Sequence, residues 1–124
     1  MLVAVTSEGY DLSSQLAERF TRSPFIIFKN TEDESFESLR NPYSEICGGA
    51  GIQTAQLVIE KNANAVIACE IGLNSFRLLQ SAKVKIYSCA KIKIEDALTE
   101  FRSGKLQELI NLSKDDEYLI RNSA

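Results

Sequence analysis

Short apolar runs separated by polar turns recur along the chain and predict five β-strands. Leu2–Val5 is mostly apolar and leads into a polar cluster. Phe25–Lys29 is aromatic and β-branched, and Ser35–Arg40 alternates imperfectly, so these two segments predict an antiparallel hairpin. Ala65–Cys69 is continuously apolar, which is typical of a strand buried on both faces, and Val84–Tyr87 predicts the last strand.

Apolar residues three and four positions apart predict helices between these strands. Leu16 and Phe20 share one face of the first candidate, and the glycine at position 104 is expected to stop the last one. The predicted helices cover residues 13–20, 52–61, 74–82 and 94–101. Three strands followed by alternating helices and strands are typical of an α/β fold with a mixed sheet.

The carboxyl edge of that sheet is where we expect a ligand. Right-handed crossovers would make Ala65–Cys69 and Val84–Tyr87 parallel to Leu2–Val5, so their carboxyl ends share one edge. The hairpin would bring Arg22 and the segment 41–51 to the same edge. Ligands of open α/β sheets gather there.

Size and charge narrow the possible functions. The chain has 124 residues, of which 44% are hydrophobic, and this predicts one domain over residues 1–112 with a polar tail over 113–124. A formal net charge of −3 gives no broad cationic field, so we expect no nucleic-acid partner. No apolar run is long enough to cross a membrane, and no export signal precedes the first strand, so a cytoplasmic protein is expected.

Cysteine and histidine usage limits the chemistry further. Three widely spaced cysteines in a chain expected to be cytoplasmic predict reduced thiols rather than a disulfide framework. The chain contains no histidine, which excludes a Ser-His-Asp triad, a Cys-His nucleophile and a Cys-His zinc finger. The central strands carry no acidic residue and Glu70 is the nearest one, so a carboxylate-dependent nuclease is not expected.

The candidate site centres on a glycine run that leads into a predicted helix. Gly48, Gly49 and Gly51 could cradle an anion through backbone N–H groups, or could simply form a tight connection. Gly72 repeats the arrangement after the next strand, and Asn74 is most simply the N-cap of the helix that follows it.

Thiols and one arginine complete the candidate site. Cys47 is either a cluster ligand or an inconsequential loop residue, whereas Cys69 and Cys89 end apolar strands and more readily suit a buried role. Arg22 could bind an anionic cofactor or form a salt bridge with Glu18.

Several segments resemble the dinitrogenase iron-molybdenum cofactor biosynthesis family, in family order from Met1 to about Leu106. The resemblance implies a ribonuclease-H-like three-layer fold with a five-stranded mixed sheet flanked by helices, without nuclease activity. The matching segments are Phe20–Phe25, Gly49–Ala55, Ala65–Ala68, Ile71–Phe76 and Glu95–Leu98.

The hypothesis from residues and resemblance together is a non-enzymatic carrier. Its cargo would be an iron-sulfur cluster or an iron-molybdenum cofactor precursor, and a cluster-donor or cluster-acceptor protein would be its partner. Three thiolates would leave a cluster partly open for release. The alternative is an enzyme or sensor that binds a small anionic metabolite without metal. The predicted cofactor-binding residues are Arg22, Gly48, Gly49, Gly51, Gly72 and Asn74, and the predicted metal ligands are Cys47, Cys69 and Cys89.

Overall fold

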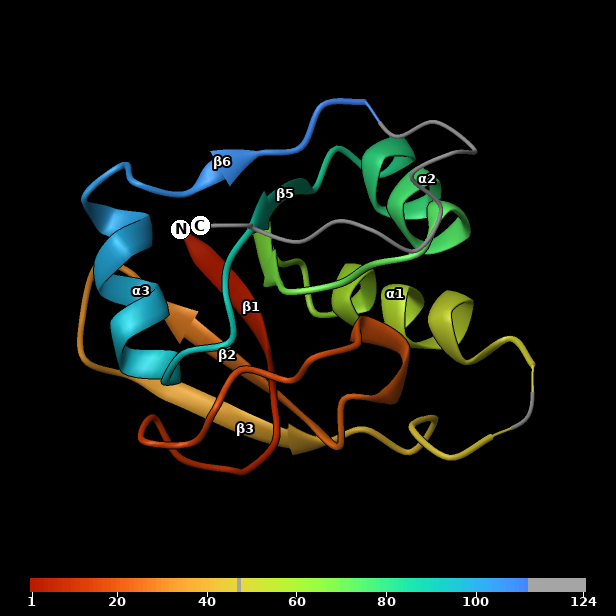
Figure 1. The fold of residues 1–124 in the computed structure, drawn as a ribbon, viewed down its shortest axis with the longest axis horizontal. Coiled ribbons are helices and arrows are strands. Elements are labelled where there is room, and N and C mark those ends of the chain that lie inside the picture. The colour runs from red at the N-terminus through yellow and green to blue at the C-terminus, as the bar shows by residue number, and fades with distance from the viewer. Residues whose placement is uncertain (47, 112–124) are drawn as a thin grey trace.

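A mixed β-sheet runs through the centre of the molecule (Figure 1). The computed structural model describes residues 1–46 and 48–111, and in this part of the chain the sheet has six strands in the order β3-β2-β1-β4-β5-β6. The strands are β1 (Leu2–Ser7), β2 (Phe25–Asn30), β3 (Phe36–Arg40), β4 (Ala65–Ala68), β5 (Lys85–Ser88) and β6 (Gln107–Glu108). The helices are α1 (Ala50–Glu60), α2 (Leu73–Ser81) and α3 (Ile94–Arg102), with a 3-10 turn, η1, at Phe20–Arg22.

The strand directions confirm the topology that the sequence predicts. β2 pairs antiparallel with both β1 and β3, which is the expected hairpin. β4 pairs parallel with β1, and β5 pairs parallel with β4. The carboxyl ends of β1, β4 and β5 therefore lie along one edge of the sheet.

Strand residues alternate between two apolar clusters, one on each face of the sheet. Ala4, Val66 and Ile86 face α1 and α2, whereas their neighbours Val5 and Ile67 face α3. Figure 1 shows α1 and α2 together on one side of the sheet and α3 on the other. We call these sides the α1/α2 face and the α3 face.

The predicted helix over residues 13–20 is wrong. Asp11 Oδ1 accepts hydrogen bonds from the Ser13 N–H and from the hydroxyl groups of Ser13 and Ser14, and such side-chain turns compete with helix formation. The backbone N–H of Leu16 donates to Ile92 O and that of Ala17 donates to Thr6 O. This segment is therefore held by neighbouring elements, and only η1 forms a helical turn.

The predicted strand count is also corrected from five to six. β6 pairs antiparallel with β5 through Tyr87 opposite Glu108 and Ser88 opposite Gln107. Two exposed polar residues show no alternation, so the sequence pattern could not reveal this strand. Within the described residues the longest helix has 11 residues, too few to span a bilayer.

Candidate functional site

Two adjoining hollows open at the carboxyl edge of the sheet, on the α1/α2 face. They share the lining residues Thr21 and Gly72, and we call the two hollows together the groove. The larger hollow, of about 390 Å³, is lined by Arg19, Phe20, Thr21, Glu70, Ile71 and Gly72. The smaller, of about 210 Å³, is lined by Thr21, Gly49, Gly51, Ile52, Gly72, Leu73, Asn74 and Ser75.

The glycine run shapes the start of α1 as the sequence predicts. Gly48 and Gly49 have φ angles of 74° and 75°, the left-handed region that glycine enters without a steric penalty. Gly49 is the N-cap of α1, and Gly51 lies in its first turn. A Cβ atom at Gly51 would come within 2.4 Å of Ser75 Oγ and 2.6 Å of Thr21 Cγ2, so any larger residue would force these side chains to move.

The start of α2 opens onto the same smaller hollow. Its N-cap is Gly72, so the expected N-cap role of Asn74 is wrong, and Asn74 instead lies exposed in the first turn. Among the described residues no side chain caps the start of α1 or α2, and neither first turn carries an acidic residue. Uncapped backbone N–H groups and two helix dipoles therefore give this end of the groove a positive character.

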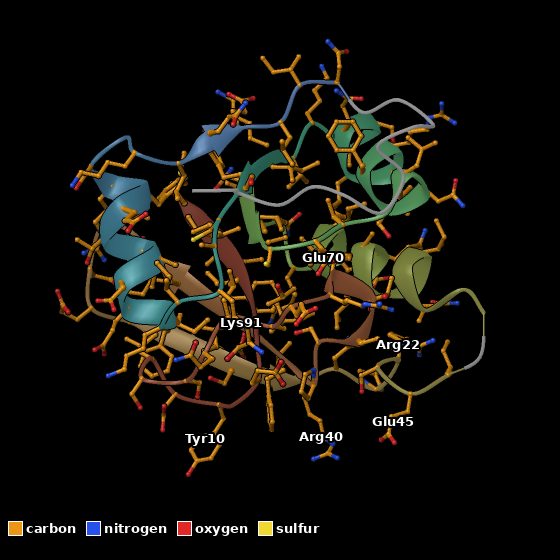
Figure 2. The ribbon with its side chains drawn as sticks, in the orientation of Figure 1. Tyr10, Arg22, Arg40, Glu45, Glu70 and Lys91 are labelled. Atoms are coloured by element: carbon orange, nitrogen blue, oxygen red, sulfur yellow. The ribbon has the colours of Figure 1, made fainter. Side chains whose placement is uncertain are left out.

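The larger hollow carries side chains of opposite charge. Arg19 and Glu70 belong to segments that pair as a short parallel bridge, with the Phe20 N–H donating to Glu70 O at 2.8 Å and the Glu70 N–H donating to Glu18 O at 3.0 Å. Glu70 is 8% exposed and lies near the centre of the view in Figure 2, with Arg22 further out on the α1 side. The groove thus has one positive end and one end of mixed charge.

Arg22 holds the chain that leads to the glycine run. Its Nη1 donates to Ser44 O at 3.1 Å and to Ile46 O at 2.9 Å, and the side chain remains exposed. The sequence predicts an anion contact or a salt bridge with Glu18 for this residue, and the structure adds a third role, since its hydrogen bonds hold the loop after β3. Arg22 is absent from the lining of both hollows.

The Asn41 side chain also holds this loop through hydrogen bonds. Its Nδ2 donates to Ser23 O at 2.9 Å and to Thr54 Oγ1 at 3.1 Å, and its Oδ1 accepts from the Tyr43 N–H. Asn41, Ser23 and Thr54 are all buried. This buried network ties the end of β3 to α1 and so fixes the approach to the groove.

Cys69 and Cys89, which we call the thiol pair, do not join the glycines. Both pack in the apolar cluster on the α3 face, with Leu16 and Ile94, whereas the groove lies on the α1/α2 face. Burial raises the pKa of Cys89 to about 12, with smaller contributions from Glu100 and Cys69. A protonated, buried thiol is a poor metal ligand.

The expected convergence of thiols and glycines is therefore corrected for these two residues. Cys47 lies outside the described residues, and its role as a ligand stays a prediction. Within residues 1–46 and 48–111, no three His, Cys, Asp or Glu side chains gather closely enough to hold a metal ion.

Sequence reasoning missed Arg19, Thr21 and Ser75 as groove residues. Thr21 follows a segment predicted to be helical, and Ser75 lies within the predicted helix over residues 74–82. The only available signal was that Gly51 and Gly72 mark close approaches of the backbone, and it did not identify the side chains that approach.

Comparisons with known proteins identify relatives over most of the chain. Residues 1–104 match the profile of a family described as dinitrogenase iron-molybdenum cofactor. An uncharacterized protein of Methanocaldococcus jannaschii is 22% identical over 108 residues, covering 87% of this chain and 91% of that protein.

Two solved structures share the fold. A candidate NifB protein from Thermotoga is 32% identical with a TM-score of 0.80, over 92% of this chain and 97% of that one. The apo form of the orange protein from Desulfovibrio gigas is 24% identical with a TM-score of 0.86, over 91% of this chain and 96% of that one.

Proposed function

Because the chain belongs to the dinitrogenase iron-molybdenum cofactor family, which is linked to metal cofactor biosynthesis, we propose that it is a non-enzymatic carrier of a metal-sulfur cofactor. The cargo is an iron-sulfur cluster, an iron-molybdenum type cofactor or a precursor of one, and it binds in the groove. One observation carries the proposal: the uncapped starts of α1 and α2 open onto the same hollow.

The chemistry of the groove suits an anionic cluster. Sulfide-rich clusters carry negative charge on their surface, and helix N-termini offer N–H donors and a positive dipole to such groups. The glycines at 49 and 72 leave the backbone open to close approach. Contacts of this kind hold the cargo as a whole and allow its release, which a carrier requires.

A thiolate from Cys47 would add one direct bond to the cargo. Cys47 immediately precedes Gly48 in the sequence, so it belongs to the segment that enters α1. Soft sulfur ligands favour iron and other thiophilic metals. The cargo is handed to or received from a cluster-donor or cluster-acceptor protein, and the exposed rim of the groove is where that partner would dock.

The strand order supports a finer assignment of the fold. Among β1 to β5, only β2 runs against the others, and the order is β3-β2-β1-β4-β5. This arrangement supports the ribonuclease-H-like label that the family resemblance implies.

Anaerobic reconstitution tests the carrier function. The protein is incubated with ferrous iron and sulfide, with molybdate in a parallel sample, then desalted and analysed for visible absorbance and for iron and molybdenum content. We expect coloured protein with a metal content close to one cluster per chain. Asn74→Asp adds a negative charge to the groove, and two like charges about 8 Å apart repel by about 2 kcal/mol at an effective dielectric constant of about 20, roughly a 30-fold loss of affinity.

Gln56→Glu is the matched control, because it adds the same charge at an exposed position of α1 outside the groove lining. It should retain the cargo. A colourless, metal-free wild type rejects the carrier function. If the desalted wild type lacks metal but binds small carboxylates or phosphates, and Asn74→Asp abolishes that binding, the groove serves a metal-free metabolite instead.

A further inference from the structure

The thiol pair lies at matched positions on adjacent parallel strands. β4 and β5 are in register from Ala65 opposite Lys85 to Ala68 opposite Ser88. Cys69 and Cys89 are the first residues after the two strands, and the Cys89 N–H donates to Ala68 O at 3.1 Å, which continues the hydrogen-bond pattern by one step. Both side chains enter the same apolar cluster on the α3 face.

This placement meets the first requirement for a disulfide. Neighbouring strands lie about 4.8 Å apart, and bridged cysteines have Cα atoms about 4.4–6.8 Å apart. Both side chains also leave the sheet on the same face, where they belong to one apolar cluster. Cys69 contributes to the raised pKa of the Cys89 thiol, which is consistent with two neighbouring groups.

From this geometry we propose that Cys69 and Cys89 form an oxidisable pair, a redox modification site at the carboxyl ends of β4 and β5. The oxidant is a small-molecule disulfide. The two thiols together lose two protons and two electrons and form one S–S bond, while the oxidant is reduced to two thiols.

Exposure fixes the order of the two steps. Cys69 is 7% exposed and Cys89 is fully buried, so the external disulfide reacts at Cys69. The Cys69 thiolate attacks one sulfur of the oxidant, forms a mixed disulfide and releases the first small thiol. The Cys89 sulfur then attacks Cys69 Sγ and forms the internal bond, while its proton passes to the departing small thiolate, which leaves as the second small thiol.

The position of the pair links it to the groove without depending on the proposed cargo. Cys69 directly precedes Glu70, and Glu70 lines the larger hollow. A bond between the two sulfur atoms would link the ends of β4 and β5 covalently, one residue away from Glu70. Because the reaction needs only the two thiols and an added disulfide, its test is independent of whether the groove binds any ligand.

Mass spectrometry tests the modification directly. The full chain carrying Cys47→Ser is treated under native conditions with hydroxyethyl disulfide, then unfolded, alkylated and digested. We expect the protein to become two hydrogen masses lighter, to take up no alkylating agent, and to yield a peptide pair that joins positions 69 and 89. Dithiothreitol should restore both alkylation sites.

Two single variants in the same background separate the steps. With Cys89→Ser the reaction should stop at a mixed disulfide on Cys69, and with Cys69→Ser the buried Cys89 should stay unmodified. The proposal is overturned if both thiols of the parent protein are alkylated after treatment. It is equally overturned by mixed disulfides on both residues, or by a bond between two chains.

Discussion

The groove and the thiol pair lie along the same edge of the sheet, yet they offer a ligand opposite environments. The groove presents uncapped N–H groups and exposed polar side chains on the α1/α2 face. The thiol pair is enclosed by apolar side chains on the α3 face. The difference arises within three consecutive residues, because Ala68, Cys69 and Glu70 contribute in turn to the α1/α2 cluster, the α3 cluster and the groove.

Because of that alternation, the position of a residue at the edge of the sheet does not determine which face its side chain joins. Parallel strands bring their carboxyl ends together, but successive side chains point to opposite sides. A cysteine one residue beyond β4 is therefore near the groove along the chain and separated from it by the sheet. A search for ligands must specify the face as well as the edge.

The largest expected effect comes from placing a carboxylate on the buried side. Cys89→Asp puts an ionisable group in a fully buried apolar site, where an uncompensated charge costs about 3–5 kcal/mol. That is a large share of the stability of a small domain. Urea unfolding followed by circular dichroism should show a protein that is largely unfolded or has a sharply lowered midpoint.

Cys89→Ala provides the matched control, because it removes the thiol without adding charge and should unfold much closer to the wild type. If Cys89→Asp were as stable as the alanine variant, the α3 face would have to admit water at this position. The contrast between the two faces would then fail.

The next largest effect on stability is expected where the starts of α1 and α2 approach each other in the groove. Gly51→Ala introduces a Cβ atom that meets Ser75 Oγ at 2.4 Å and Thr21 Cγ2 at 2.6 Å. Overpacking of this kind costs about 1–3 kcal/mol. The unfolding midpoint should fall, and cargo binding should fall with it as the smaller hollow narrows.

Gln53→Ala changes an exposed position in the same helix and should alter stability by less than about 0.5 kcal/mol. Equal stability of the two alanine variants would contradict the tight contact between α1, α2 and η1.

Alkaline pH should reveal the buried thiol. The pKa of Cys89 is raised from 9.0 to about 12 in the folded protein, chiefly by burial. Below pH 9 the thiol is protonated in both states and has no effect on the pH dependence of stability. Above pH 9 the unfolded chain loses this proton while the folded one keeps it, so each pH unit lowers the free energy of unfolding by about 1.4 kcal/mol.

The measurement compares wild type with Cys89→Ala by urea unfolding at pH 8 and pH 10. The wild type should lose about 1.4 kcal/mol more than the variant over this range, since all other titrating groups are common to both. Identical losses would show that Cys89 titrates normally and is exposed to water.

The sequence was sufficient for the α/β class, the directions of the first five strands and part of the groove. The continuous apolar run at Ala65–Ala68 and the glycines at 48, 49 and 51 carry strong local signals, and the structure confirms the strand and the positive φ angles at Gly48 and Gly49. The helix prediction for residues 13–20 was wrong because Asp11 and its serine neighbours form a turn, which the spacing of apolar residues does not reveal.

The prediction that Cys69 and Cys89 join the glycines was wrong for a different reason. The residues after a strand end have no pattern of their own, so neither Cys69 nor Glu70 reveals which face it joins. The pairing of Arg22 with the carbonyl groups of Ser44 and Ile46 likewise depends on a loop whose path no sequence period specifies.

The smallest effect on stability is expected when a carboxylate is introduced in the groove rather than at the thiol pair. Asn74→Asp adds a charge at an exposed position in the first turn of α2, where the helix dipole favours it by about 0.3–1 kcal/mol. The free energy of unfolding should stay unchanged or rise slightly at low salt, and any rise should shrink at 1 M salt because the charge is screened. A carboxylate that unfolds the protein at Cys89 is thus tolerated at Asn74, while cargo binding is weakened there. A marked loss of stability in Asn74→Asp would show that the start of α2 is neither exposed nor positive. That result would contradict anion binding in the groove.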